Sequence, residues 1–150
     1  MKKTRMTLCL ALAALLLFPL LVSCEAPGVV LLESLLPPLV EKATGYTVTE
    51  SIVVTDNATG KTVTFSAPTD MNTFHQQVEG IKCVKESAKG EYDRPYSITF
   101  NTANESVTLD VVTTPGIRED KSTRFFVGGK RYDAIVGGVD LFYLAGLFKD

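Results

Sequence analysis

The chain of 150 residues has room for one domain of ordinary size and hardly for two. Its hydrophobic content of 45% overstates the apolar character of the body, because much of the excess lies in residues 1–22. Once the three basic residues of that stretch are set aside, 12 basic residues face 17 acidic ones. This acidic balance argues against a nucleic-acid partner, since non-specific binding to phosphates requires a basic face.

Residues 1–23 have the parts of a secretory signal peptide. Lys2, Lys3 and Arg5 make the start positive, and the 17 residues from 6 to 22 carry no charge. A small residue, Ser23, ends the segment. We therefore expect these residues to direct export and to be removed from the mature protein.

The sequence Leu21-Val22-Ser23-Cys24 resembles the lipobox of bacterial lipoproteins. In that family the chain is cut directly before the cysteine, and a diacylglyceryl group is attached to the cysteine sulfur. The resemblance implies cleavage between Ser23 and Cys24, lipidation of Cys24 and attachment to the extracytoplasmic face of the cell membrane. Two acyl chains anchor a protein stably, whereas one anchors it only marginally.

The residues alone leave two alternatives to lipidation open. An ordinary signal peptidase that cuts after Ala26 would release a soluble protein. Retention of the apolar run would leave a membrane-spanning segment, although 17 residues interrupted by Pro19 are at the short limit for a span. A Cys24→Ala variant that still partitioned into detergent like the parent would exclude the lipid.

Residues 24–45 are predicted to be a lipid-anchored tether that carries an apolar segment. Val29–Leu32 and Leu35–Val40 are unusually apolar for a tether. Pro37-Pro38 should end or kink any helix that approaches from the N-terminal side. A short helix over 39–44 is compatible with the second proline in its first turn. The segment is expected to dock on the domain, to rest near the bilayer or to contact a partner.

Residues 46–150 are predicted to form one small domain. Alternating apolar and polar residues, as in Tyr96 to Asn101, are typical of strands that are buried on one face. The expected strands cover residues 46–55, 62–65, 81–86, 96–101, 107–111, 123–127 and 131–136.

Two helices are expected in the same domain. Met71, Phe74 and Val78 recur at helical spacing after a cap at Thr69 or Asp70, and a second helix is expected from about residue 139. The order is written β-β-α-β-β-β-β-α. Short links favour an α+β fold with a mostly antiparallel sheet of about six to seven strands and both helices packed on one face.

No catalytic residue, metal site or cofactor is predicted. Cys83 is the only cysteine of the body, which excludes a disulfide framework, and we expect it to be a half-buried hydrophobe in a strand. His75 is the only histidine and is expected on the exposed surface of a helix, so the usual zinc ligands are missing. The fold could bring two of four aspartates together as an acid–base pair. These are Asp110, Asp120, Asp133 and Asp140.

Phe125, Phe126 and Tyr132 form the candidate binding patch. Phe125 and Phe126 are adjacent in an expected strand, so their side chains must point to opposite faces of the sheet. Whichever side chain faces outward is expected to contribute to an exposed patch for a peptide or a glycan. The alternative is that a helix or the apolar segment 29–40 covers it.

The layout of the whole chain resembles small, functionally uncharacterised surface lipoproteins of Gram-positive bacteria. In these, a lipobox precedes a hairpin built around a Thr-Gly-Lys turn (here Thr59-Gly60-Lys61), a helix and further antiparallel strands. The resemblance rests on layout and implies no activity. We expect a membrane-anchored, non-enzymatic binding or interaction module whose partner is a cell-surface protein, a peptide or a glycan. The alternatives are a small cell-wall enzyme or inhibitor that uses acidic residues, and a passive structural lipoprotein.

Overall fold

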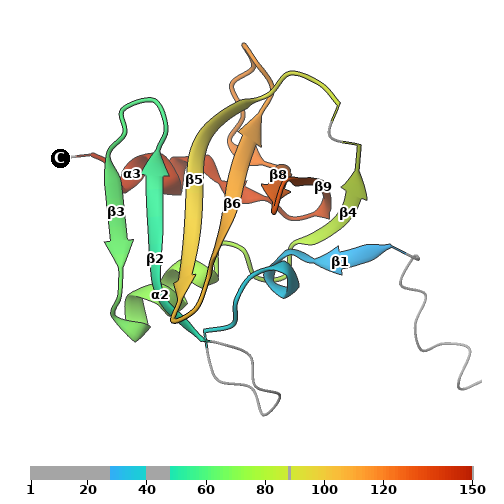
Figure 1. Ribbon diagram of the computed structural model, residues 1–150. Helices are drawn as coiled ribbons and strands as arrows, with labels where there is room; N and C mark the ends of the chain where they lie inside the picture. Colours follow the sequence, from blue (N-terminus) through green and yellow to red (C-terminus); the bar gives the residue numbers. More distant parts are fainter. Residues whose placement is uncertain (1–27, 40–47, 88, 150) are drawn as a thin grey trace, which may run out of the picture.

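The computed structural model describes residues 28–39, 48–87 and 89–149 (Figure 1). The predicted signal peptide, the lipobox with Cys24 and most of the predicted helix over 39–44 lie outside the described residues. In chain order the elements are β1 (Val29–Leu31), the 3₁₀ helix η2 (Leu32–Leu35), β2 (Thr49–Asp56), β3 (Thr62–Phe65), α2 (Pro68–His75), β4 (Lys82–Glu86), β5 (Asp93–Thr102), β6 (Ser106–Thr113), β7 (Lys121–Ser122), β8 (Arg124–Val127), β9 (Lys130–Val136), β10 (Val139–Asp140) and α3 (Leu141–Gly146).

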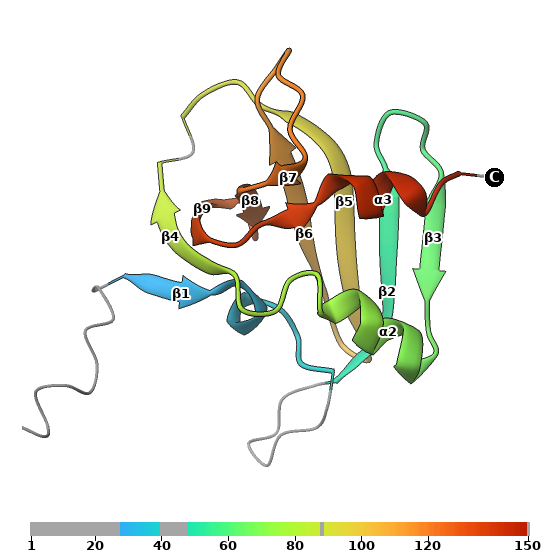
Figure 2. The same cartoon turned by 180° about the vertical axis from the view of Figure 1, so that it is seen from behind.

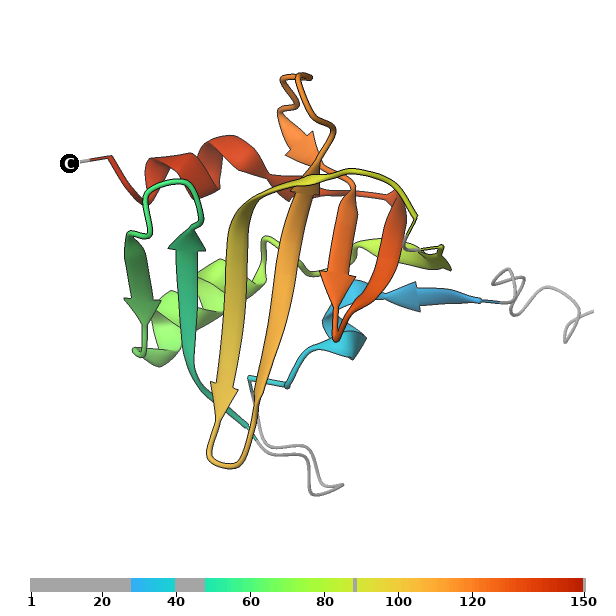
Figure 3. The ribbon, with the colours of Figure 1, turned by 45° about the horizontal axis from the view of Figure 1, so that its top comes forward.

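Eight strands form one sheet in the order β1-β4-β9-β8-β6-β5-β2-β3, and β7 and β10 form a separate two-stranded sheet. All the paired strands are antiparallel. Figure 3 shows that the large sheet is curved, so that β4 and β1 lie behind the strands from β2 to β9. The predicted α+β fold with a mostly antiparallel sheet is confirmed, with more strands than the six to seven expected.

One face of the large sheet carries the core and the helices. Ile98 and Leu109, which are partners across β5 and β6, are fully buried on this inner face. Figures 1 and 2 show α2 and α3 on the same side of the sheet. Phe74 of α2 joins the layers, because its ring centroid lies 5.3 Å from that of Phe65 in β3 and 6.1 Å from that of Tyr143 in α3.

The outer face of the large sheet carries polar side chains over much of its width. Thr55, Ser97 and Asp110 are in register on β2, β5 and β6. The hydroxyl of Ser97 donates to Oδ1 of Asp110 at 2.8 Å, and the hydroxyls of Thr99 and Thr108 lie 3.1 Å apart. Because successive residues of a strand point to opposite faces, the alternation in the sequence produces this division into an apolar and a polar face.

Helix α2 is shorter than predicted, and neither Thr69 nor Asp70 caps it. The residue at the N-cap is Ala67, which offers no side-chain acceptor, and Pro68 lies in the first turn. A proline is tolerated there because its missing N–H would have no partner within the helix. The helix ends at His75, and turns carry the chain on to β4.

Part of the segment predicted to be a tether belongs to the folded unit. Val29–Leu31 pairs with β4 as an edge strand of the large sheet. Leu32 and Leu36 are buried in the core. Thr49 fastens the end of this stretch, because its hydroxyl donates to the carbonyl oxygen of Pro37 at 3.0 Å. For residues 28–39, docking on the domain is therefore the observed alternative, and the domain begins before residue 46.

Candidate functional site

The three aromatic residues predicted to form a binding patch are all buried. Phe125 and Tyr132 are partners across β8 and β9 and lie in the core, with exposed fractions of 0% and 8%. Phe126 points to the outer face, as the alternation requires, yet it is only 6% exposed. The expected outward-facing aromatic therefore exists, but neighbouring side chains cover it and no exposed patch results.

Arg94 and Tyr92 cover the ring of Phe126. The guanidinium carbon of Arg94 lies 4.5 Å from the centroid of the Phe126 ring, and Tyr92 packs edge-on against the same ring at a centroid distance of 6.0 Å. The guanidinium of Arg131 lies over Tyr92 in turn, at 4.8 Å. Attraction between a cation and an aromatic face favours this arrangement. These four residues, Arg94, Phe126, Tyr92 and Arg131, are named the outer stack.

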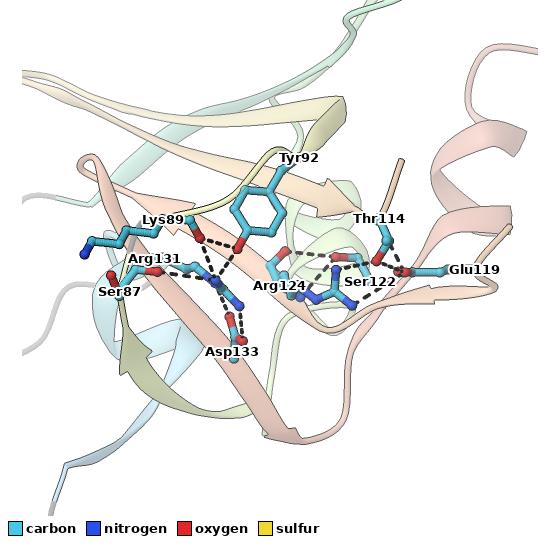
Figure 4. A network of polar contacts seen from close by, with 9 residues as sticks. All are labelled: Ser87, Lys89, Tyr92, Thr114, Glu119, Ser122, Arg124, Arg131 and Asp133. Carbon is cyan, nitrogen blue, oxygen red and sulfur yellow. Dashed lines mark hydrogen bonds and ion pairs between the residues drawn. The ribbon is translucent and has the colours of Figure 1, made fainter. Parts of the chain in front are cut away.

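Arg131 fastens the connection between β4 and β5 onto the sheet (Figure 4). Its Nε donates to Oδ1 of Asp133 at 2.7 Å, and its Nη2 donates to Oδ2 of the same carboxylate. Its Nη1 donates to the hydroxyl of Tyr92 and to the carbonyl oxygens of Ser87 at 3.3 Å and Lys89 at 3.5 Å. The hydrogen bonds that Arg131 donates to Asp133 raise the pKa of Arg131 above its ordinary value. The polar groups of the outer stack are thus directed to partners within the chain.

Three of the four aspartates considered for acid–base chemistry have structural partners. Asp110 pairs with an arginine of the outer stack at 2.9 Å, and Asp133 pairs with another. Asp140 accepts two backbone hydrogen bonds at the start of α3. Asp120 is exposed on the loop before β7. Within residues 28–39, 48–87 and 89–149, no group of three or more His, Cys, Asp or Glu side chains could hold a metal ion.

Cys83 and His75 lie in separate elements, β4 and α2. Cys83 is fully buried in β4 opposite Ala134. Burial raises the pKa of its thiol from 9.0 to about 11, with smaller contributions from Asp133 and Glu33. The group therefore stays a neutral thiol near neutral pH, as expected for a structural hydrophobe. His75 is half-buried at the end of α2, less exposed than predicted.

An open groove of about 290 Å³ lies between the loop after β6 and helix α3. Its lining includes two large apolar side chains that are mostly exposed, Ile117 at 59% and Phe142 at 54%. The remaining residues of the lining are Pro95, Tyr96, Thr113, Arg118, Glu119, Leu141 and Ala145. Exposed apolar side chains that share one concave surface are typical of binding sites.

The loop that carries Ile117 is held at its base (Figure 4). The carboxylate of Glu119 accepts from the N–H of Thr114 at 3.3 Å and from its hydroxyl at 2.9 Å. Arg124 of β8 donates to the same hydroxyl, and its Nη2 lies 3.7 Å from the Glu119 carboxylate. The N–H of Ile117 donates to the carbonyl oxygen of Thr114 at 3.1 Å, which closes a tight turn. Ile117 is the last residue of this turn and lies between Thr114 and Glu119, which these contacts join.

Helix α3 is fixed beside this loop. Oδ1 of Asp140 accepts from the N–H groups of Phe142 at 2.8 Å and Tyr143 at 3.0 Å, which is an N-cap. The two residues of β10, just before the helix, pair with β7 at the end of the loop. The N–H of Leu141 also donates to the carbonyl oxygen of Asp120 at 3.0 Å. Hydrogen bonds therefore hold the backbone on both sides of the groove.

Arg118 gives the groove a positive charge. Its guanidinium carbon lies 5.9 Å from the centroid of the Phe142 ring. No ion pair among the described residues includes Arg118, whereas the neighbouring Glu119 is engaged by Arg124. Burial, followed by the charge of Asp56, raises the pKa of Tyr96, so that its hydroxyl stays neutral. The groove thus combines an apolar lining with a cation that can meet an anionic group.

Ile117, Arg118 and Phe142 were not among the site residues predicted from the sequence. A signal for Ile117 was present, because it is the only large apolar residue in the polar loop from 113 to 122. Phe142 lies off the apolar stripe of Leu141, Leu144 and Phe148, which indicates an outward direction. The proximity of these two residues could not be read from either signal.

No family model, curated protein or solved structure matches this chain. In the part of the chain that the structure describes, no helix is both long enough and apolar enough to cross a membrane. The groove and the sequence motif at Cys24 are therefore the features that bear on function.

Proposed function

We propose that the protein is an extracytoplasmic lipoprotein, held at the cell membrane through Cys24, whose domain binds a peptide segment of a cell-surface partner. The motif Leu21-Val22-Ser23-Cys24 supports the lipid anchor. One observation carries the binding role: Ile117 and Phe142, each more than half exposed, line the same groove. The module is non-enzymatic, because holding a peptide in this groove requires no reacting group.

The fixed position of both residues supports binding over chance exposure. Single exposed apolar side chains are normal on protein surfaces. Here the Glu119–Arg124 contact holds one of them, and the Asp140 cap holds the other. A surface that is already ordered loses less conformational entropy when it binds, and this raises affinity without further contacts.

The shape and charge of the groove indicate its ligand. A volume of about 290 Å³ suits one or two side chains better than a large cofactor. The apolar lining favours an aliphatic or aromatic side chain, and Arg118 favours a carboxylate beside it. The proposed ligand is therefore an extended peptide in which an apolar residue is next to an acidic one.

The proposal can be tested by photo-crosslinking of the full-length protein in the cell that produces it. p-Benzoylphenylalanine replaces Phe142, and captured peptides are identified by mass spectrometry. We expect one discrete segment that contains an apolar residue next to an acidic residue. The segment, made as a synthetic peptide, should bind the purified lipoprotein about tenfold more weakly after Arg118→Glu.

Ile135 provides a matched control position, since it is exposed to 55% and lies outside the groove. Crosslinker at Ile135 should not capture the same segment. An Ile117→Ser variant should weaken peptide binding and leave the free energy of unfolding within about 0.5 kcal/mol of the parent, as expected for an exposed substitution. Equal capture by crosslinkers at Phe142 and Ile135 would refute the proposed site. Peptide binding that Arg118→Glu and Ile117→Ser leave unchanged would also refute it.

A further inference from the structure

We infer that the surface at the β1 edge of the sheet rests on the lipid bilayer. The domain would then contact the membrane both through the lipid on Cys24 and through side chains of this surface. This inference depends on the lipidation in the proposed function and adds a second membrane contact to it. Its basis is a group of exposed apolar residues, a basic residue among them and the short chain length between that group and Cys24.

The apolar group, named the edge patch, consists of Leu31 of β1, Ile135 and Val136 of β9, which are exposed, and the half-buried Val29 of β1. Leu31 is 39% exposed, Ile135 55% and Val136 54%. Leu31 and Val136 both pair with Lys82 of β4, so the three residues follow one another across adjacent strands. A register shift next to Lys82 leaves Ile135 unpaired, and it is this irregularity that exposes two apolar residues in succession.

A second groove, of about 260 Å³, lies at this edge. It is lined by Val29, Val30, Leu31, Ser34 and Lys82. Lys82 is the single charged residue of that lining. Lysine at a membrane surface lays its aliphatic stem along apolar surface and directs its ammonium to anionic headgroups. Apolar residues around an exposed lysine therefore match the chemistry of an anionic bilayer surface.

The length of chain before β1 keeps the edge patch near the anchor. Val29 is the fifth residue after Cys24, and a chain spans at most about 3.6 Å per residue, or about 18 Å for this separation. The bound holds for any path of the intervening residues. With Cys24 held at the membrane surface, the β1 edge is the part of the described domain that must lie close to lipid.

The same geometry explains why this surface, and not the groove at α3, is assigned to the bilayer. Figures 1 and 2 show β1 low on one side of the molecule, α3 on the opposite side, and the loop between β6 and β7 at the top. The groove that contains Ile117 and Phe142 is consequently remote from the anchor. A second copy of the chain is a less suitable occupant of the edge patch, since the preceding chain leads to the anchor at this very edge.

Fluorescence quenching in vesicles tests the inference directly. The chain contains no tryptophan, so Val136→Trp introduces a single reporter at the edge patch. The full-length lipidated variant is reconstituted into phosphatidylcholine and phosphatidylglycerol vesicles whose acyl chains carry bromine, a contact quencher. We expect the fluorescence to fall about twofold relative to unbrominated vesicles, and Lys82→Glu in the same variant should reduce the quenching.

Phe142→Trp is the matched control, because Phe142 is exposed to the same fraction as Val136 and belongs to α3, which lies on the side of the molecule opposite β1 (Figure 1). It should show no quenching. Ile135→Trp serves as a second reporter if Val136→Trp does not fold by circular dichroism. Equal fluorescence in the two kinds of vesicle for the edge-patch reporters overturns the inference.

The mass of the mature protein separates this failure from failure of the proposed function. If the diacylglyceryl group is found on Cys24 and the edge-patch reporters are unquenched, the anchor stands and the second contact is refuted. If Cys24 carries no lipid, the lipoprotein assignment and the inference that depends on it are both overturned. Quenching at the edge patch together with the lipid supports both.

Discussion

Replacing Phe126 with alanine is expected to destabilise the domain, although Phe126 faces away from the helices. Its ring is only 6% exposed, because Arg94 lies over it and Tyr92 packs against its edge. A residue at an outward-facing strand position would ordinarily tolerate this change at a cost below about 0.5 kcal/mol. The outer stack predicts a much larger effect.

The magnitude follows from the burial and the contacts. Truncation of a buried phenylalanine to alanine costs about 3–5 kcal/mol in protein cores. The cost here lies near the lower end, since the Arg94 side chain is 50% exposed and can move into the space that the ring leaves. Loss of the cation–π and edge-to-face contacts, about 0.5–1 kcal/mol each, is included in that figure. We expect the free energy of unfolding to fall by about 3 kcal/mol.

The assay is urea denaturation of the full-length protein in a non-ionic detergent, followed by circular dichroism. With a urea dependence of about 2 kcal/mol per molar, the midpoint should fall by about 1.5 M. Phe142→Ala is the matched control, because Phe142 is 54% exposed, and its midpoint should move by less than a third as much. Equal midpoints for the two variants would show that Arg94 and Tyr92 do not cover Phe126 in solution.

Two further predictions concern the buried thiol and the cap of α3. Cys83, fully buried, should react with a maleimide near neutral pH only after unfolding in urea, and rapid labelling of the folded protein would contradict its burial. Because burial raises the pKa of this thiol from 9.0 to about 11, in that pH range the unfolded state ionises while the folded state does not. The contribution of this thiol to the free energy of unfolding is therefore retained below pH 9 and is lost between pH 9 and 11, by roughly 2–3 kcal/mol. Cys83→Ala should remove that part of the pH dependence of the urea midpoint. Asp140→Ala should lower the free energy of unfolding by about 1 kcal/mol through loss of the hydrogen bonds to the N–H groups of Phe142 and Tyr143, whereas Asp140→Asn, which retains an acceptor, should lose much less.

The main strands and helices could be predicted because their pattern is local. Ile98 and Phe100 alternate with polar residues, and both are buried in β5. Strand β1 could not be predicted in this way. Val29–Leu31 belongs to a continuous apolar run, and it becomes a strand only because β4, far along the chain, offers an edge to pair with. The predicted cap of α2 failed because the helix already begins at Pro68, two residues before the start that a cap at Thr69 would give.

The sequence partly indicates that Phe126 is buried on the outer face. Phe125, Phe126 and Val127 form an uninterrupted apolar run, which is typical of a strand buried on both faces. The identity of the cover depends on the registers of β5 on β6 and of β6 on β8, which bring Arg94 and Tyr92 over the ring. Such non-local registers are outside the reach of a periodicity argument.

The groove was missed for a related reason. Ile117 and Phe142 approach each other because the two-residue strands β7 and β10 pair, and strands of this length have no recognisable propensity. The contacts that fix the loop, between Glu119 and Arg124, join a turn to a strand that the sequence does not mark as its neighbour. Individual residue types therefore gave hints, and the fold alone placed them in one site.

The positions of the two surfaces make the proposals compatible with each other. If Cys24 carries the lipid, the short chain before Val29 prevents the β1 edge from turning far from the bilayer, whatever the rotation of the domain about its anchor. With the edge patch on the bilayer, the groove lies away from the membrane, because α3 is on the opposite side of the molecule from β1 (Figure 2). Membrane attachment and peptide binding use separate residues, so neither has to displace the other. The two surfaces keep a fixed separation because β1 belongs to the same eight-stranded sheet as the strands on which α2 and α3 pack.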